Sequence, residues 1–178
     1  SLGDGTGQVR LTPVEVVGLQ AGVRVLATGS FHTCAINASR RVQCWGANFD
    51  GRLGNGNLLN SAMPVDVQGL GNVDALALAL GDSHACAVLA GGAVKCWGTN
   101  AFGQLGDGTT QDRLAAVDVV GLGSGVRAIS AGYANTCAIT SGGALKCWGA
   151  NGAGQLGDGT RINRSAPVDV VGLGSGVL

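Results

Sequence analysis

The amino-acid sequence predicts an all-β fold built from repeated units of four antiparallel strands. Three observations support this prediction: a long internal repeat, apolar segments that are short and β-branched, and an excess of glycine. Glycine accounts for 33 of the 178 residues, whereas its ordinary frequency is about 7%. The chain has neither a glycine at every third position nor a high net charge nor a helical pattern. Collagen-like, disordered and coiled-coil classes are therefore excluded.

The repeat runs through the whole chain. Cys-Trp-Gly occurs three times, at intervals of 52 and 51 residues, beginning at Cys44, Cys96 and Cys147. A second cysteine lies ten positions before each of them, at Cys34, Cys86 and Cys137. The loop Leu-Gly-Asp/Asn-Gly occurs four times, beginning at Leu2, Leu53, Leu105 and Leu156. These markers occur at the same relative positions in every copy of the repeat. They define a single repeat array over 1–178, with units at about 1–52, 53–104 and 105–154 and a partial unit at 155–178.

The strands of one unit can be assigned in the second copy. We expect them at Ala75–Leu80, at His84–Leu89, at 93–97 and, earlier in the chain, at 65–67. The turn at Gly91 and Gly92 tolerates positive φ, so the second and third strands should form a hairpin. The first copy has Ser39, Arg40 and Arg41 at this turn. Because glycine is missing there, we expect a different type of turn or a longer loop.

A unit of about 51 residues and four strands, without a helix, resembles one blade of a β-propeller. The repeated pattern further resembles repeats of the regulator of chromosome condensation family. In the second copy the pattern comprises Gly81, His84, Trp97, Asn100 and the Gly-Gln-Leu-Gly segment at 103–106. The resemblance covers essentially the whole chain, and the cysteine-rich form is more similar to exported bacterial members than to nuclear eukaryotic ones. It implies part of a seven-bladed type of propeller that presents loops to a protein partner, with no chemistry common to all members.

Two positions depart from the family pattern. Asn135 stands in the third copy where the first two have His32 and His84, and Arg52 stands in the first copy where the others have glutamine. The nucleotide-exchange activity of the founding member depends on acidic and basic residues that have no counterpart we can place here, so we do not infer it. The chain holds about 3.5 units. We therefore expect it to be a segment of a longer exported protein.

The six cysteines form three pairs of identical spacing. In a hairpin centred on Gly91, Cys86 and Cys96 face each other, and directly opposed residues of antiparallel strands lie close enough for a disulfide. The expected disulfides are Cys34 with Cys44, Cys86 with Cys96, and Cys137 with Cys147. Disulfides imply an oxidising compartment, outside the cell or at its surface. Buried free thiols are the alternative, whereas zinc is disfavoured by the cysteine spacing and by the presence of only two histidines for three pairs.

Composition and motifs exclude several classes of function. Eleven basic and eleven acidic residues give a formal net charge of zero, which disfavours a nucleic-acid partner. The longest uninterrupted aliphatic stretch, Ala75–Leu80, is much shorter than the ~20 residues of a membrane-spanning helix. Because the sequence has no nucleophile elbow, complete calcium loop or dinucleotide-binding glycine pattern, we expect no enzymatic activity, no cofactor and no metal. His32 and His84 are expected to bond loop backbone.

The remaining candidates divide into a core set and a loop set. Trp45, Trp97 and Trp148 recur in one phase, which favours packing between neighbouring sheets. The loops that follow them differ most between copies, and loops on a rigid scaffold commonly carry binding residues. We expect contacts with a partner from Leu58, Leu59, Arg113, Arg161, Ile162 and Arg164.

These observations together favour a non-enzymatic extracellular scaffold that binds a protein or a surface glycan through its blade loops. The alternative is a self-assembling structural protein. Unpaired sheet edges recruit other chains, and two unlike ends would make a head-to-tail contact that forms oligomers or filaments.

Overall fold

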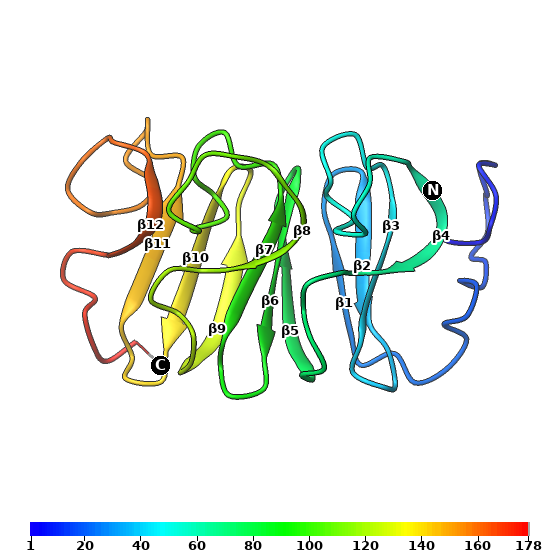
Figure 1. The fold of residues 1–178 in the computed structure, drawn as a ribbon, viewed down its shortest axis with the longest axis horizontal. Coiled ribbons are helices and arrows are strands. Elements are labelled where there is room, and N and C mark those ends of the chain that lie inside the picture. The colour runs from blue at the N-terminus through cyan, green and yellow to red at the C-terminus, as the bar shows by residue number, and fades with distance from the viewer. Residues whose placement is uncertain (178) are drawn as a thin grey trace.

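The computed structural model describes residues 1–177, which contain twelve β-strands in three four-stranded antiparallel sheets (Figure 1). Blade 1 comprises β1 (Val25–Thr28), β2 (His32–Ile36), β3 (Val42–Gly46) and β4 (Ser61–Asp66). Blade 2 comprises β5 (Ala75–Leu80), β6 (His84–Leu89), β7 (Val94–Gly98) and β8 (Arg113–Asp118). Blade 3 comprises β9 (Val126–Ala131), β10 (Asn135–Thr140), β11 (Leu145–Gly149) and β12 (Arg164–Asp169). The all-β blade architecture predicted from the repeat is confirmed.

In each blade the fourth strand follows the Cys-Trp-Gly segment in the sequence. It does not precede the first strand. The assignment of residues 65–67 to the second sheet is therefore wrong, because Val65 of β4 lies opposite Cys44 of β3. Blade 2 is completed by β8, in which Val117 lies opposite Cys96. The loop after each Cys-Trp-Gly segment returns the chain to the same sheet, and the connection after the fourth strand leads to the next blade. The sheets consequently straddle the boundaries of the sequence units.

The cysteine hairpins of all three blades close with turns of the same length and the same backbone hydrogen bond. In blade 2, Leu89 N–H donates to Ala93 C=O at 2.8 Å, and in blade 1 Asn37 N–H donates to Arg41 C=O at 3.0 Å. Blade 3 has the equivalent bond between residues 140 and 144 at 2.9 Å. The longer loop expected as one possibility for blade 1 is thus not found. Its backbone differs from that of blade 2 at one position, because Gly91 has a φ of 85° and the equivalent Ser39 does not have a positive φ. Arg40 adopts a φ of 59°, in the left-handed region that glycine occupies in the other two turns.

The side chain of Asn37 explains how this turn forms without glycine. Its Oδ1 accepts hydrogen bonds from the backbone N–H groups of Ser39 and Arg41, at 3.0 and 3.1 Å. These bonds stabilise the turn from inside, as asparagine commonly does. Arg40 also forms an ion pair with Asp74 at 3.5 Å, but both side chains are exposed and the pair contributes little.

Replacing Arg40 by glycine is expected to raise the free energy of unfolding by about 0.5–1 kcal/mol. Left-handed backbone costs an L-residue about 1–2 kcal/mol, and the greater freedom of glycine in the unfolded chain offsets part of that gain. Urea denaturation measures the change. Arg40→Ala is the control, since it removes the same side chain but keeps the strained φ. Equal stabilities for the glycine and alanine variants would contradict this explanation.

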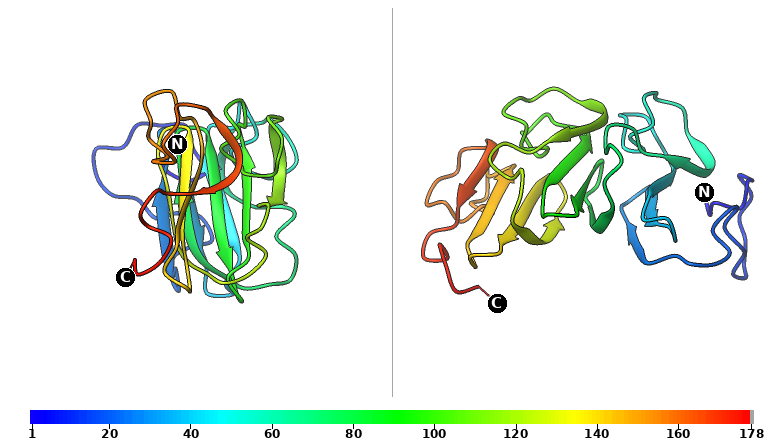
Figure 2. Two further views of the ribbon diagram at one scale, coloured as in Figure 1. Left: turned by 90° about the vertical axis from the view of Figure 1, so that its left-hand side faces the viewer. Right: turned by 60° about the horizontal axis from the view of Figure 1, so that its bottom comes forward.

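The hydrophobic core lies between the blades. One cluster combines Cys34, Ile36 and Val42 of blade 1 with Ala87 and Trp97 of blade 2. A second cluster joins blades 2 and 3 in the same way and includes Val88, Val94 and Trp148. Each blade is therefore stabilised mainly by its neighbours. The blades follow one another along the long axis, with the N-terminal segment at one end and the C-terminal segment at the other (Figures 1 and 2). No helix among the described residues is long and apolar enough to cross a membrane.

Candidate protein-binding face

Two kinds of loop meet at the same end of every blade: the turn between its first and second strands, and the long loop between its third and fourth (Figure 1). One backbone hydrogen bond of 2.8–2.9 Å joins them in each blade, from Ala47 to Phe31, from Thr99 to Ser83 and from Ala150 to Ala134. We call this surface the loop face. It consists of the turns 29–31, 81–83 and 132–134 and the loops 47–60, 99–112 and 150–163. Because turn and loop are tied together, each blade presents them as one unit.

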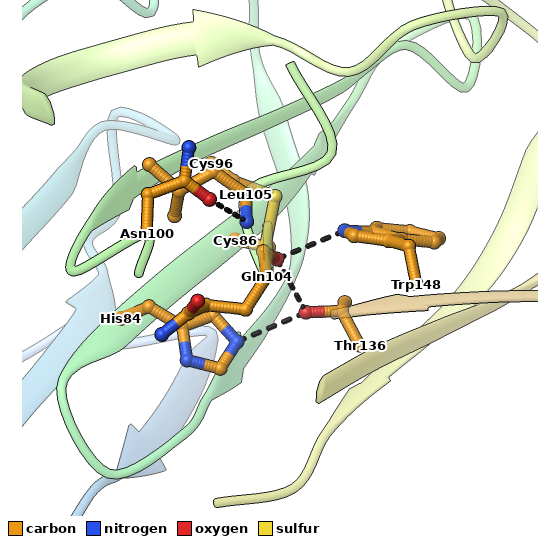
Figure 3. The surroundings of a disulfide bond; sticks show 8 residues. All are labelled: His84, Cys86, Cys96, Asn100, Gln104, Leu105, Thr136 and Trp148. Atoms are coloured by element: carbon orange, nitrogen blue, oxygen red, sulfur yellow. Dashed lines mark hydrogen bonds between the residues drawn. A yellow bond between two sulfur atoms is a disulfide. The ribbon is translucent and has the colours of Figure 1, made fainter. Parts of the chain in front are cut away.

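A buried asparagine holds each long loop in shape. In blade 2, Asn100 Nδ2 donates to Asp107 Oδ1 at 3.0 Å and to Thr109 C=O at 3.1 Å. Its Oδ1 accepts a hydrogen bond from Leu105 N–H at 3.0 Å (Figure 3). Asn48 and Asn151 have the same role in blades 1 and 3. All three asparagines are fully buried, so the loops are supported from within.

Two of the predicted partner-contact residues belong to this internal support. Arg113 pairs with Asp107 at 2.8 Å, and Arg164 pairs with Asp158 at 2.7 Å. Burial by itself would raise the pKa of Asp107, but hydrogen bonds from Thr109, Arg113 and Asn100 hold it below the ordinary value. Because their guanidinium groups are engaged inside the loops, Arg113 and Arg164 are less suited to partner contact than the other four predicted residues.

The remaining predicted contacts lie on the exposed part of the loop face. Leu59 is 74% exposed, and Leu58, Arg161 and Ile162 are also exposed. The structure adds three aromatic residues that sequence reasoning missed: Phe31, Phe49 and Tyr133, each at least 70% exposed. They stand where the other copies have Ser, Ala, Gly or Asp, so they break the repeat at the surface. That departure from the repeat is the signal by which they could have been found.

Trp97 and Trp148 pack between blades, as their phase predicts, whereas Trp45 packs against Val16 and Leu19 of the N-terminal segment. Trp97 and Trp148 are fully buried, and Trp45 is nearly so. Trp97 Nε1 donates to the Arg52 carbonyl of the preceding blade at 3.0 Å, and Trp148 Nε1 donates to the Gln104 carbonyl at 2.9 Å (Figure 3). Each of these two indoles, Trp97 and Trp148, therefore joins two blades through both its apolar surface and its N–H group.

The structure contains three disulfides, each within the hairpin of one blade. They join Cys34 to Cys44, Cys86 to Cys96 and Cys137 to Cys147, with Cα atoms 4.0–4.1 Å apart. Each pair consists of directly opposed residues in the strand register. These are the pairs that the hairpin symmetry of the sequence predicts.

The two histidines lie between blades and do not bond loop backbone, which corrects the sequence-based expectation. His84 Nε2 donates to Thr136 Oγ1 of blade 3 at 2.9 Å, because that hydroxyl group itself donates to the Gln104 carbonyl (Figure 3). His32 is also buried, and neither of its ring nitrogens has a partner among the described residues. The hydrogen-bond partner of His84 therefore comes from across the blade interface, whereas the turn glycines Gly29 and Gly81 pack against the two rings.

The buried histidines make stability depend on pH. Burial lowers the pKa of His84 to about 4, with a further contribution from His32. The unfolded chain therefore binds more protons than the folded chain between pH 6.5 and 4, so stability is full above pH 6.5 and falls as the pH decreases through this window. Between pH 7 and 5, His84 is expected to account for about 2 kcal/mol of this loss. The variant His84→Asn, which copies Asn135 of blade 3, should show a correspondingly shallower decrease in denaturation experiments, and an unchanged slope would contradict the assignment.

A single substitution tests why His32 lacks a partner. Ala85 of blade 2 and Thr136 of blade 3 both lie opposite a tryptophan, at equivalent positions. Ala85→Thr should therefore supply His32 with the hydroxyl acceptor that His84 already has, and raise the free energy of unfolding by about 1 kcal/mol. Ala85→Val has the same shape without the hydroxyl group. If the two variants are equally stable, the hydrogen bond contributes nothing.

Three four-stranded blades joined by repeated tryptophans define a repeat protein of the β-propeller class. Two sequence models described as the regulator of chromosome condensation (RCC1) repeat match the chain. One matches residues 23–52, 76–104 and 126–155, and the other matches 41–88, 92–139 and 143–177. The chain belongs to this family.

Similar proteins cover a range of functions. The ultraviolet-B receptor UVR8 of Arabidopsis thaliana is 36% identical over 176 residues, which cover 97% of this chain and 40% of that protein. The probable E3 ubiquitin-protein ligase HERC4 of Mus musculus is 32% identical over 150 residues, covering 83% of this chain and 14% of that protein. The chain thus spans at most about two fifths of the length of these relatives.

Solved structures show the same fold. Prp20p of Saccharomyces cerevisiae, whose structure was described together with its binding properties to Gsp1p and histones, superposes with a TM-score of 0.75 at 17% identity. The match covers 83% of this chain and 38% of Prp20p. Human WBSCR16 gives a TM-score of 0.73 at 24% identity, covering 84% of this chain and 38% of that protein.

Proposed function

We propose that the chain is a non-enzymatic scaffold that binds a protein partner through its loop face, outside the cell. The observation that carries this proposal is the set of exposed apolar side chains on internally supported loops. Leu58, Leu59 and Phe49 lie in the long loop of blade 1, and Ile162 lies in that of blade 3. Exposed apolar patches on soluble proteins commonly mark interaction sites. The buried asparagines limit the ordering that these loops must undergo on binding, which reduces the entropic cost.

A protein partner fits this surface better than a surface glycan. The exposed set contains aliphatic as well as aromatic side chains, and all three tryptophans, the best stacking platforms, are buried. Prp20p, a structural relative, is described as binding Gsp1p and histones, so the fold is compatible with recognition of proteins. An extracellular location is supported by the three disulfides, because such bonds persist in oxidising compartments.

A matched pair of variants tests the proposal. Three proteins are immobilised and exposed to the secreted proteins of the source organism. They are the unmodified chain, the double variant Phe49→Glu/Leu59→Glu and the single variant Leu76→Glu. Leu76 is the control because it is 46% exposed but lies in β5, away from the loop face. We expect a protein that is retained by the unmodified chain and by the control and lost with the loop-face variant. Retention that is insensitive to Phe49 and Leu59, or no retained protein at all, would contradict the proposal.

Self-association is a second candidate function, and one observation favours it. An apolar hollow of about 370 Å³ lies on blade 1 at the end of the row of blades, bordered by Leu19, Val23, Leu26, Ala35 and Trp45. The equivalent face of blade 2, with Ala87 and Trp97, is covered by blade 1. The hollow therefore marks a surface that in the rest of this molecule packs against another blade.

A further inference from the structure

A hollow of about 220 Å³ lies beside the hairpin turn of blade 1, and we call it the hairpin hollow. The hairpin turns are at the end of the blades opposite to the loop face (Figure 1). The turn forms one wall, and the connection 70–75, which leads into β5, forms the other. Val42, Leu70 and Ala75 are buried and supply an apolar lining. All of the lining belongs to residues 40–75, well inside the described chain.

The hairpin hollow is open because the connection after blade 1 is longer than the connection after blade 2. Residues 71–74 stand where blade 2 has 123–125, so one residue is added. After blade 2, Gly125 N–H donates to Gly91 C=O at 3.0 Å, which holds the connection against the hairpin turn. Among the described residues, Asp74 N–H forms no equivalent backbone bond. The longer connection therefore lies less closely against the turn.

Arg41 supplies an oriented positive charge to the hairpin hollow. The equivalent residues of the other two blades are Ala93 and Ala144. Arg41 Nη1 donates to Gly71 C=O at 2.8 Å, and its Nη2 donates to Asn72 Oδ1 at 3.1 Å. Both acceptors are uncharged, and no ion pair within residues 1–177 includes Arg41. Neutral groups thus hold the guanidinium group in place without compensating its charge.

Asp66 supplies a negative charge that is held in the same way. In blade 2 the equivalent Asp118 pairs with Lys95 of the opposite strand at 2.8 Å, and blade 3 has the same pair at 2.7 Å. Blade 1 has Gln43 in place of the lysine, and its Nε2 donates to Asp66 Oδ1 at 3.0 Å. The amide of Gln43 is itself fixed by a hydrogen bond of 3.2 Å from Asn37 Nδ2. The carboxylate is therefore positioned but not neutralised.

We propose that the hairpin hollow binds a free α-amino acid with a small apolar side chain. The ligand's carboxylate pairs with Arg41, because a guanidinium group binds a carboxylate through two parallel hydrogen bonds. Its ammonium group pairs with Asp66, and its side chain contacts Val42 and Leu70 of the apolar lining. A simple anion meets the Asp66 carboxylate and a simple cation meets the guanidinium group, so a ligand with both charges fits best.

The size and the other charges of the hairpin hollow agree with this ligand. At about 220 Å³ it is smaller than the ~300–1,000 Å³ of sites for drug-sized ligands. Arg40 also lines it, but its charge is compensated by the pair with Asp74. Because Arg41 and Asp66 are already held in position, little ordering is needed when the ligand binds. The inference is independent of the proposed function, since the loop face is at the other end of the blades.

Isothermal titration calorimetry of the unmodified chain with L-valine tests the inference. Two analogues are matched controls. The amide of L-valine keeps the ammonium group but has no carboxylate, and isovalerate keeps the carboxylate and the isopropyl group but has no ammonium group. We expect saturable binding of L-valine at one site. Each analogue should bind about tenfold or more weakly, because each lacks one charge-assisted contact.

Gln43→Lys is the most specific variant, because it leaves every side chain that lines the hairpin hollow unchanged. It gives Asp66 the ion pair that the other two blades have, and it should weaken L-valine binding about tenfold or more. Arg41→Gln should have an effect of the same size. Lys95→Gln makes the opposite change in blade 2, away from the hollow, and should bind L-valine as the unmodified chain does.

The possible outcomes are distinct. Absence of saturable L-valine binding by the unmodified chain would overturn the inference, and so would equal binding of L-valine and either analogue. Binding that is unaffected by Gln43→Lys would exclude Asp66 as the partner of the ammonium group and overturn the inference as well. The comparison of ligands uses the unmodified chain, so it does not depend on the folding of any variant. None of these outcomes alters the expectation for the loop face.

Discussion

Replacing Trp97 by alanine is expected to lower the free energy of unfolding by about 3–5 kcal/mol, the usual range for a buried aromatic residue. Trp97 is fully buried in the cluster between blades 1 and 2, so its removal opens a cavity at the interface that stabilises both blades. The substitution also leaves the Arg52 carbonyl without its indole donor. Both effects act on packing between blades, which is where most of the core of this molecule lies. Thermal and urea denaturation measure the change.

Two further substitutions serve as comparisons. Trp45→Ala should have a smaller effect, because Trp45 is covered by Val16 and Leu19 of the N-terminal segment rather than by a whole blade and borders an open hollow. Leu59→Ala, on the exposed part of the loop face, should have almost none. If the melting temperature of Trp97→Ala equals that of the unmodified chain, tryptophan packing does not hold the blades together.

Reduction of all three disulfides is expected to lower the free energy of unfolding by roughly 6–9 kcal/mol. Each disulfide joins cysteines ten positions apart, and closing a loop of that length restricts the unfolded chain by about 2–3 kcal/mol. The contributions should add, because the three bonds lie in different blades and share no partner residues. A stability loss of this size is comparable with the whole stability of many domains. Reduction alone is therefore expected to unfold much of the chain.

Urea denaturation of the oxidised and fully reduced chain measures this effect, with mass spectrometry to verify the number of free thiols. Replacing one pair, Cys86 and Cys96, by alanine should cost about a third of the total. An unchanged denaturation midpoint after complete reduction would contradict the stabilising role of the disulfides.

The hairpins could be predicted from the sequence because their determinants are local. Gly91 and Gly92 place the turn, and once the turn is placed the strand register follows by counting, so Cys86 opposes Cys96. The fourth strand could not be assigned in the same way. A repeat has no natural starting point, and residues 65–67 are closer in sequence to β5 than to β3, although they pair with β3. Only the path of the connecting loops decides between the two sheets.

The environment of the histidines and the turn of blade 1 were not predictable from local spacing. The partner of His84 is Thr136, 52 positions away on the next blade, and the contact exists only because the blades pack side by side. At Arg40, glycine is absent, but the two hydrogen bonds to Asn37 compensate for its absence. In both cases a side-chain contact, which spacing does not reveal, overrides the rule from which the prediction was made.

The loop face was predicted in part. The variable loops correctly drew attention to exposed Leu58, Leu59 and Ile162. Arg113 and Arg164 were grouped with them because they lie in the same variable segments, yet each pairs with an aspartate inside its loop. Whether any of these side chains contacts a partner stays a prediction.

Peptide mapping without reduction is the most direct test of the central claim, that each four-stranded blade contains a hairpin closed by its own disulfide. Proteolysis of the chain with free thiols blocked should yield three linked pairs, Cys34 with Cys44, Cys86 with Cys96 and Cys137 with Cys147. Blocked free thiols at these positions, or links between cysteines of different blades, would contradict the hairpin register, the expected stabilisation and the extracellular location that is proposed from it.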